Sequence, residues 1–171
     1  MGDPNPCTDC TTPGRYCVFD GKKAAENMRK LSALSRAMFA GMGEMFGYTP
    51  GSIDNVFYWP LDLESAHGRR YQPVYPAPAA DRPLRIVHAS NHRMFKGTRF
   101  LIEAVEQLKA EGVSVELVLV ERVPNKEALE LYKSADVIFD QCIMGNYGFF
   151  ALEGMALGKP VMCFIRHPEQ Y

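Results

Sequence analysis

A chain of 171 residues, 47% of them hydrophobic, can bury a sizeable core and has the length of one domain or of one domain with an appendage. Its 19 basic and 20 acidic side chains give a net charge of -1, so no global charge attracts it to nucleic acid or anionic lipid. The longest apolar stretches, such as 117–120 and 147–152, are far shorter than the roughly 20 residues of a membrane helix. The N-terminal part has no apolar core of a signal peptide. We therefore expect no transmembrane span, no nucleic acid partner and a cytoplasmic location.

The N-terminal part of the sequence predicts little regular structure. Residues 1–20 contain prolines without an apolar period and should form an irregular arm. Apolar residues recur at helical spacing over 22–36, which predicts an amphipathic helix, and residues 56–59 read as a short strand ended by Pro60. This part, residues 1–67, has too few strands to close a core by itself.

The cysteines of the arm allow two interpretations. Cys7-x-x-Cys10 followed by Cys17 supplies three of the four ligands of a zinc site, but no fourth ligand follows at a typical spacing. The alternative is a loop with reduced thiols. Because the ligand set is incomplete, we predict no metal and no cofactor.

Residues 68–83 contain four prolines and little apolar period, a composition that predicts an extended linker. After it, short apolar runs alternate with amphipathic segments, which is typical of right-handed crossovers and a parallel sheet. The sequence thus predicts an α/β fold in which a Rossmann-like parallel sheet is flanked by helices over 84–171. The expected elements are strand 84–89, helix 97–110, strand 115–120, helix 126–134, strand 137–139, helix 148–157 and strand 161–164.

Two segments of this region carry candidate binding residues. Arg93 and Lys96 lie between the first strand and its helix, where the helix amino terminus and two full charges suit a diphosphate. Further along, the loop Gly145, Asn146, Tyr147 and Gly148 opens a helix that contains Glu153. A carboxylate there can accept hydrogen bonds from the two vicinal hydroxyls of a ribose. The alternatives are solvated charges at Arg93 and Lys96 and a plain helix carboxylate at Glu153.

Taken together, these segments resemble glycosyltransferase family 4, the group 1 transferases with the GT-B fold. The resemblance lies in the pattern Gly148-x-x-x-x-Glu153-x-Met155-Ala156-x-Gly158-Lys159-Pro160-Val161 and in the Lys96-Gly97 step before a helix. It also includes Glu127-Ala128-Leu129-x-x-Tyr132-x-x-Ala135-Asp136-Val137, and it spans about residues 55–165.

The resemblance implies a role for each matching position. Glu153 would bind the ribose, Lys96 with Arg93 the diphosphate, and the loop from Gly145 to Gly148 the donor sugar. The loop Val123, Pro124 and Asn125 would lie against the base, although Asn125 could equally be an ordinary helix cap. Two positions depart from the family pattern, because its first glutamate falls on Gly145 and its loop arginine on Asn91.

The implied activity is retaining transfer of a sugar from a nucleotide-sugar donor, UDP- or GDP-linked, to an unidentified acceptor, with no obligatory metal. Members of the family have two such domains. We expect this chain to hold most of the donor-binding one, incomplete at both ends and inactive alone, and to self-associate through its exposed apolar surface. The alternative is a non-catalytic nucleotide or nucleotide-sugar binding module. His88 and His92 lack an acid or thiol partner for catalysis in the sequence.

Overall fold

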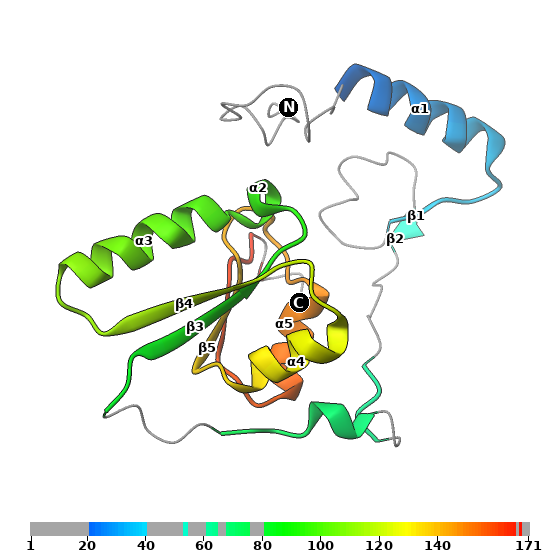
Figure 1. Cartoon of the computed structure of the whole chain (residues 1–171). Coiled ribbons are helices and arrows are strands. Elements are labelled where there is room, and N and C mark those ends of the chain that lie inside the picture. The colour runs from blue at the N-terminus through cyan, green and yellow to red at the C-terminus, as the bar shows by residue number, and fades with distance from the viewer. Residues whose placement is uncertain are drawn as a thin grey trace. The chain divides into compact units, whose positions relative to one another are not determined.

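A computed structural model describes residues 21–40, 53–54, 61–64, 68–75, 81–166 and 168 of the chain. The chain divides into two compact units, Met1–Tyr58 and Trp59–Tyr171 (Figure 1). The cysteines of the arm and the expected strand 56–59 lie outside the described residues. In the first unit, helix α1 (Gly21–Leu34) confirms the expected amphipathic helix, and strand β1 (Phe39–Ala40) pairs in parallel with β2 (Ile53–Asp54).

The second unit contains a four-stranded parallel sheet in the order β4-β3-β5-β6. This confirms the predicted α/β, Rossmann-like fold, and every expected strand and helix from residue 84 onward forms within two residues of its predicted bounds. The strands are β3 (Leu84–Ala89), β4 (Val115–Val120), β5 (Val137–Gln141) and β6 (Val161–Cys163). The helices that connect them are α3 (Thr98–Ala110), α4 (Asn125–Lys133) and α5 (Phe149–Ala156).

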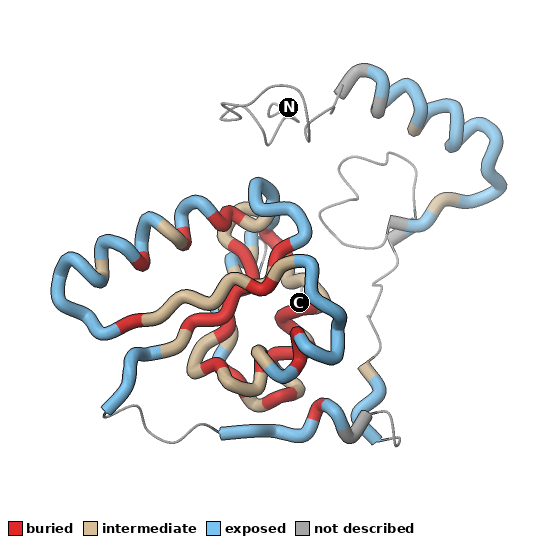
Figure 2. Tube along the Cα trace, in the orientation of Figure 1, coloured by how far each residue is buried: buried red, intermediate tan, exposed pale blue. Residues whose placement is uncertain are grey.

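The helices cover both faces of this sheet. Ile86 of β3 packs with Leu101 and Val105 of α3, whereas its neighbour Val87 packs with Leu129 of α4 and other residues of α4 and α5. Successive strand residues point to opposite faces, so α3 lies on one face and α4 and α5 on the other, with the buried residues between them (Figures 1 and 2). This is the arrangement that right-handed crossovers require for this strand order.

The strand order also fixes where a ligand crevice belongs. From β3 the chain passes through α3 to β4 on one side, and from β5 it passes through α5 to β6 on the other. The connections that leave β3 and β5 therefore diverge to opposite faces. In open parallel sheets, ligands bind outside the carboxyl ends of the strands at such a switch point.

Residues 68–75 contribute to the core of the second unit. The sequence predicted an extended linker from residue 68, but Gly68–Tyr71 forms a short 3-10 helix, η2. The Tyr71 side chain is 3% exposed and lies in the core cluster with Tyr132 and Phe150. The Val74 amide then donates to the Leu157 carbonyl at 3.0 Å, which holds the segment along α5. The proline content of this segment did not indicate the contact with the core. The contact depends on the Tyr71 side chain, whose partners are distant in sequence.

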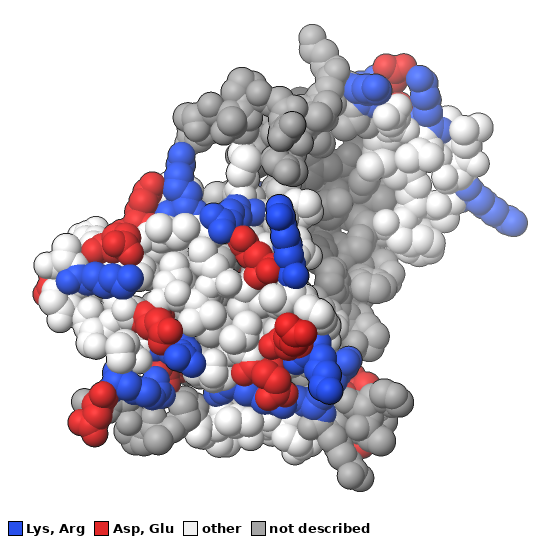
Figure 3. Space-filling view, viewed as in Figure 1, with Lys and Arg blue, Asp and Glu red and all other residues white. Residues whose placement is uncertain are grey.

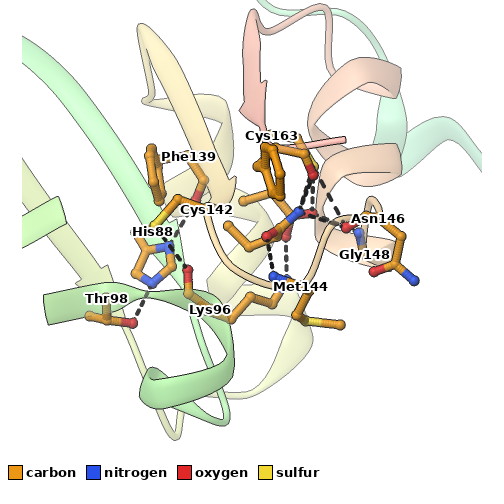
Figure 4. A network of polar contacts seen from close by, with 12 residues as sticks. His88, Lys96, Thr98, Phe139, Cys142, Met144, Asn146, Gly148 and Cys163 are labelled. Atoms are coloured by element: carbon orange, nitrogen blue, oxygen red, sulfur yellow. Dashed lines mark hydrogen bonds and ion pairs between the residues drawn. The ribbon is translucent and has the colours of Figure 1, made fainter. Parts of the chain in front are cut away.

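His88 is a structural residue near the carboxyl end of β3. Its ring is fully buried, with Nδ1 2.8 Å from the Phe139 carbonyl oxygen and Nε2 2.7 Å from the Thr98 hydroxyl (Figure 4). A carbonyl oxygen can only accept, so Nδ1 carries the proton and Nε2 accepts from Thr98. The neutral ring thus joins β3 to β5 and α3. Burial lowers the pKa of His88, outweighing the carbonyl contact, which raises it.

We expect His88 to make the stability of the second unit pH-dependent. Its folded-state pKa is lowered, so the unfolded chain binds the proton first, and the free energy of unfolding should fall as the pH drops below about 6.5. The slope contributed by one histidine is at most about 1.4 kcal/mol per pH unit. Urea unfolding of the parent chain and of His88→Gln between about pH 7.5 and about pH 5.5 measures how the free energy of unfolding depends on pH. The exposed His92, changed to Gln, is the control, and equal slopes in the parent chain and His88→Gln would contradict the assignment.

Candidate functional site

A buried ion pair lies at the switch point. The ammonium group of Lys96, the last residue of the short helix α2 (Arg93–Lys96), pairs with the carboxylate of Asp140 in β5. The Asp140 side chain is completely buried, and that of Lys96 is 16% exposed. Asp140 also accepts the Gly148 amide at 2.6 Å, and Gly148 is the N-cap of α5 (Figure 4). The pair therefore connects the end of α2, β5 and the start of α5.

Gly97 brings Lys96 to this position. It ends α2 and begins α3 with φ 75°, and a Cβ on it would lie 2.3 Å from the Cys142 sulfur. The Cys142 amide donates to the Lys96 carbonyl at 3.1 Å. Only glycine meets both demands at once, because other residues disfavour this conformation and their side chains would overlap Cys142.

The loop after β5 is held by one buried amide side chain. The Gln141 Nε2 donates to the Asn146 carbonyl at 2.8 Å and to the Phe164 carbonyl at 2.6 Å, and its Oε1 accepts the Met144 amide at 2.7 Å. Gln141 thus fixes the course of the expected donor-sugar loop, whose residues Asn146 and Gly148 belong to the polar network of Figure 4. Asn146 is buried, and Tyr147 and Gly148 are half-buried. The Gln141 Nε2 also lies 3.2 Å from the Cys163 sulfur in β6. A buried polar side chain with partners in two loops and a strand cannot be identified from apolar spacing.

Gly145 has a conformational reason to be glycine. Its φ is 85°, in the left-handed region, and its carbonyl accepts the Arg166 amide at 2.8 Å. A glutamate, the residue of the family pattern at this position, would be strained in this backbone conformation. The backbone conformation of this loop thus favours glycine at position 145.

The structure places the two expected phosphate-binding cations beside different strands. The Arg93 guanidinium makes two hydrogen bonds to Glu121, at 2.6 and 2.8 Å, just past the end of β4, whereas Lys96 reaches β5. The hydrogen bonds raise the pKa of Arg93 and lower that of Glu121. Basic and acidic side chains are interspersed over the face of the molecule in Figure 3. Both cations thus already have a carboxylate partner that a bound anion would have to share.

Glu153 and Asn125, predicted to contact ribose and base, are brought together. Glu153 is 4% exposed, and its Oε1 accepts the Asn125 amide at 3.3 Å and the Tyr71 hydroxyl at 3.2 Å. Burial raises the pKa of Glu153, and the two hydrogen bonds lower it. Asn125 is the first residue of α4 after Pro124, the N-cap, so the interpretation of Asn125 as a helix cap is wrong. Val123 and Pro124 are exposed in the loop before α4.

Asp140, Gln141 and Tyr71 take part in these clusters but were not predicted as site residues. Asp140 could have been suspected, because it follows an apolar strand and precedes the glycine loop at a predicted carboxyl edge. Within the described residues, no group of three or more His, Cys, Asp or Glu side chains could hold a metal ion. None of the described helices has the length and apolar character needed to cross a bilayer.

Comparisons with known proteins give no relative for this chain. No family model, no curated protein and no solved structure matches it. A functional assignment must therefore start from the fold and from the side chains at the carboxyl edge of the sheet.

Removing one partner of the buried ion pair should be strongly destabilising. Replacing Lys96 with methionine leaves the Asp140 carboxylate buried without its cation, a change that costs about 3 kcal/mol of unfolding free energy. Adding Asp140→Asn should restore part of this loss, because the amide oxygen can still accept the Gly148 N–H. Denaturant unfolding of the two single variants and the double variant gives the coupling energy. Arg93→Met, which breaks an exposed pair, is the control and should cost less than about 1 kcal/mol. Equal losses at Lys96 and Arg93 would contradict the interpretation.

Proposed function

We propose that this chain binds a UDP- or GDP-linked sugar as the donor domain of a retaining glycosyltransferase. The observation that carries the proposal is the position of the Glu153 carboxylate. It lies on the helix that follows the glycine loop and is held by Asn125, the first residue after the loop between β4 and α4. Ribose and base contacts would then come from neighbouring elements, as the resemblance in sequence implies.

The switch point supplies a place for the diphosphate. Lys96 has three N–H donors, of which the Asp140 carboxylate takes up only part, and its ammonium lies beside the start of α5. The amino end of a helix and a lysine together favour an anion. Asp140 reduces the net positive charge there, so phosphate binding would depend on the helix amides as well as on Lys96. Arg93 would approach the same anion from the side of β4.

In this proposal the described residues bind the donor and stabilise its leaving group. Positive charge and loop amides would stabilise the diphosphate as its bond to the sugar breaks. The proposal assigns no residue to proton transfer, and it requires no metal. The acceptor hydroxyl would be positioned by groups other than those described here.

A second candidate function is a nucleotide-binding module that transfers no sugar. The left-handed backbone at Gly145 favours it, because that position cannot easily carry the carboxylate that the family pattern places against the donor sugar. Because the donor domain alone is expected to transfer no sugar, binding and not turnover separates the two candidates. A donor site should bind a UDP- or GDP-sugar more tightly than the nucleotide without its sugar, and calorimetry measures both affinities. Equal affinities would favour the module.

Glu153→Gln tests the nucleotide site directly. The substitution keeps the shape of the side chain but removes its charge, so a hydrogen bond from a ribose hydroxyl should weaken by about 1.5 kcal/mol or more. We expect the affinity for UDP or GDP to fall at least about tenfold, and that for the 2′-deoxy counterparts to change much less. Isothermal titration calorimetry measures the affinities of the parent chain and the variant for UDP, GDP and their 2′-deoxy counterparts. Glu127→Gln, the same change at an exposed acid on α4, is the matched control. An equal loss for ribose and deoxyribose ligands would contradict the proposal.

A further inference from the structure

Among the described residues, the partners of the Glu153 carboxylate lie on one of its oxygens. Both hydrogen bonds that it accepts from the described residues, from the Tyr71 hydroxyl and the Asn125 amide, end on Oε1 and neither on Oε2. A carboxylate has about four acceptor sites on its two oxygens, so the second oxygen retains capacity for ligand hydroxyls. Two donors on one oxygen also fix the rotation of the group.

Both donors are held by surrounding structure. The Tyr71 ring is 3% exposed and packs in the core with Tyr132 and Phe150, and the Val74 amide bond to Leu157 ties the segment to α5. Asn125 belongs to the first turn of α4, directly after its N-cap. Donors whose own positions are fixed in this way can preorganise a carboxylate before any ligand arrives.

We propose that Tyr71 and Asn125 are positioning residues that hold Glu153 Oε1 and thereby direct Oε2 to the ribose hydroxyls of the ligand. The inference rests on the proposed nucleotide site and adds the residues that make it specific for ribose. Tyr71 comes from the segment that precedes the sheet, so the sheet and its helices alone do not complete the site.

Tyr71 could instead compete with the ligand, and removal of its hydroxyl would then raise the ligand affinity and not lower it. Its hydroxyl would occupy the place of a ribose hydroxyl. Competition would require the ring to leave the core in which Tyr132 and Phe150 enclose it, and that loss of buried apolar surface opposes displacement. Positioning requires no such movement. Removing the hydroxyl should therefore weaken ribonucleotide binding, whereas removal of a competitor would strengthen it.

The polar and titratable groups that face Glu153 come from two elements. Tyr71 and Arg70 belong to η2, and Asn125 and Tyr132 to α4. Burial raises the pKa of Glu153, while the hydrogen bonds from Asn125 and Tyr71 and the charge of Arg70 lower it. Loss of either hydrogen bond should therefore raise this pKa further and shift the acid limb of nucleotide binding to higher pH.

The first experiment compares Tyr71→Phe with Tyr132→Phe in the full chain. Tyr132 is the matched control, because it is a buried tyrosine of the same core for which the described contacts show no hydrogen bond to Glu153. We expect Tyr71→Phe to weaken UDP or GDP binding about fivefold and the 2′-deoxy counterparts much less, whereas Tyr132→Phe should affect both ligands alike. Tighter ribonucleotide binding, or equal losses for both ligands, would overturn the inference.

The second experiment needs no ligand. The carboxyl carbon of Glu153, titrated by NMR in the parent chain, in Tyr71→Phe and in Asn125→Ala, should report a higher pKa in both variants. Asn125 is exposed, so its variant keeps the test available if Tyr71→Phe unfolds. An unchanged titration in a folded variant would overturn positioning, even where the parent chain binds nucleotide. If the parent chain binds no nucleotide, the proposed function fails and with it the ribose role, while the titration still decides whether the two donors hold the carboxylate.

Discussion

The arrangement of the carboxyl edge depends on one completely buried carboxylate. A charge at the Asp140 position is tolerable only if it is paired and hydrogen-bonded, and the Lys96 ammonium and the Gly148 amide provide these partners. Meeting this requirement brings α2 against β5 and sets the first residue of α5. The close approach of Gly97 to Cys142 and the loop held by Gln141 lie at the same end of β5, directly after this carboxylate in the sequence.

The elements of the sheet could be predicted from sequence because each has its own local signal. Strands such as β4 are short apolar runs, and helices such as α3 carry an apolar stripe. Because burial sets the spacing of the apolar residues, this spacing shows whether a segment forms a strand or a helix. The ends of the elements follow from glycine and proline residues that interrupt regular structure, for example Gly97 before α3 and Gly158-Lys159-Pro160 after α5. The short helices α2 and η2 have no such stripe and were not predicted.

The site was predictable only in part, because sequence gives charges and not their partners. Glu153 and Asn125 were both expected near the nucleotide, but nothing in their spacing showed that they bind one another. Arg93 and Lys96 are close in sequence and read as one cationic pair, yet Glu121 and Asp140 bind them at the ends of different strands. Such pairing is a tertiary property: it depends on which carboxylates the strand order β4-β3-β5 places on each side of β3.

The contact between Tyr71 and Glu153 has a consequence for the order in which the protein matures. The two residues are 82 positions apart, whereas Asn125 and Glu153 are 28 apart. During synthesis, residues 68–75 leave the ribosome long before α5 exists, and chain is made at about 5–20 residues per second. The Tyr71 ring must wait several seconds, at those rates, for its partners on α5, although core residues such as Val87 and Leu129 are made earlier. The nascent chain therefore carries an aromatic segment with an incomplete core for that interval, and the hydrogen bonds to Glu153 are among the last contacts of the second unit to form.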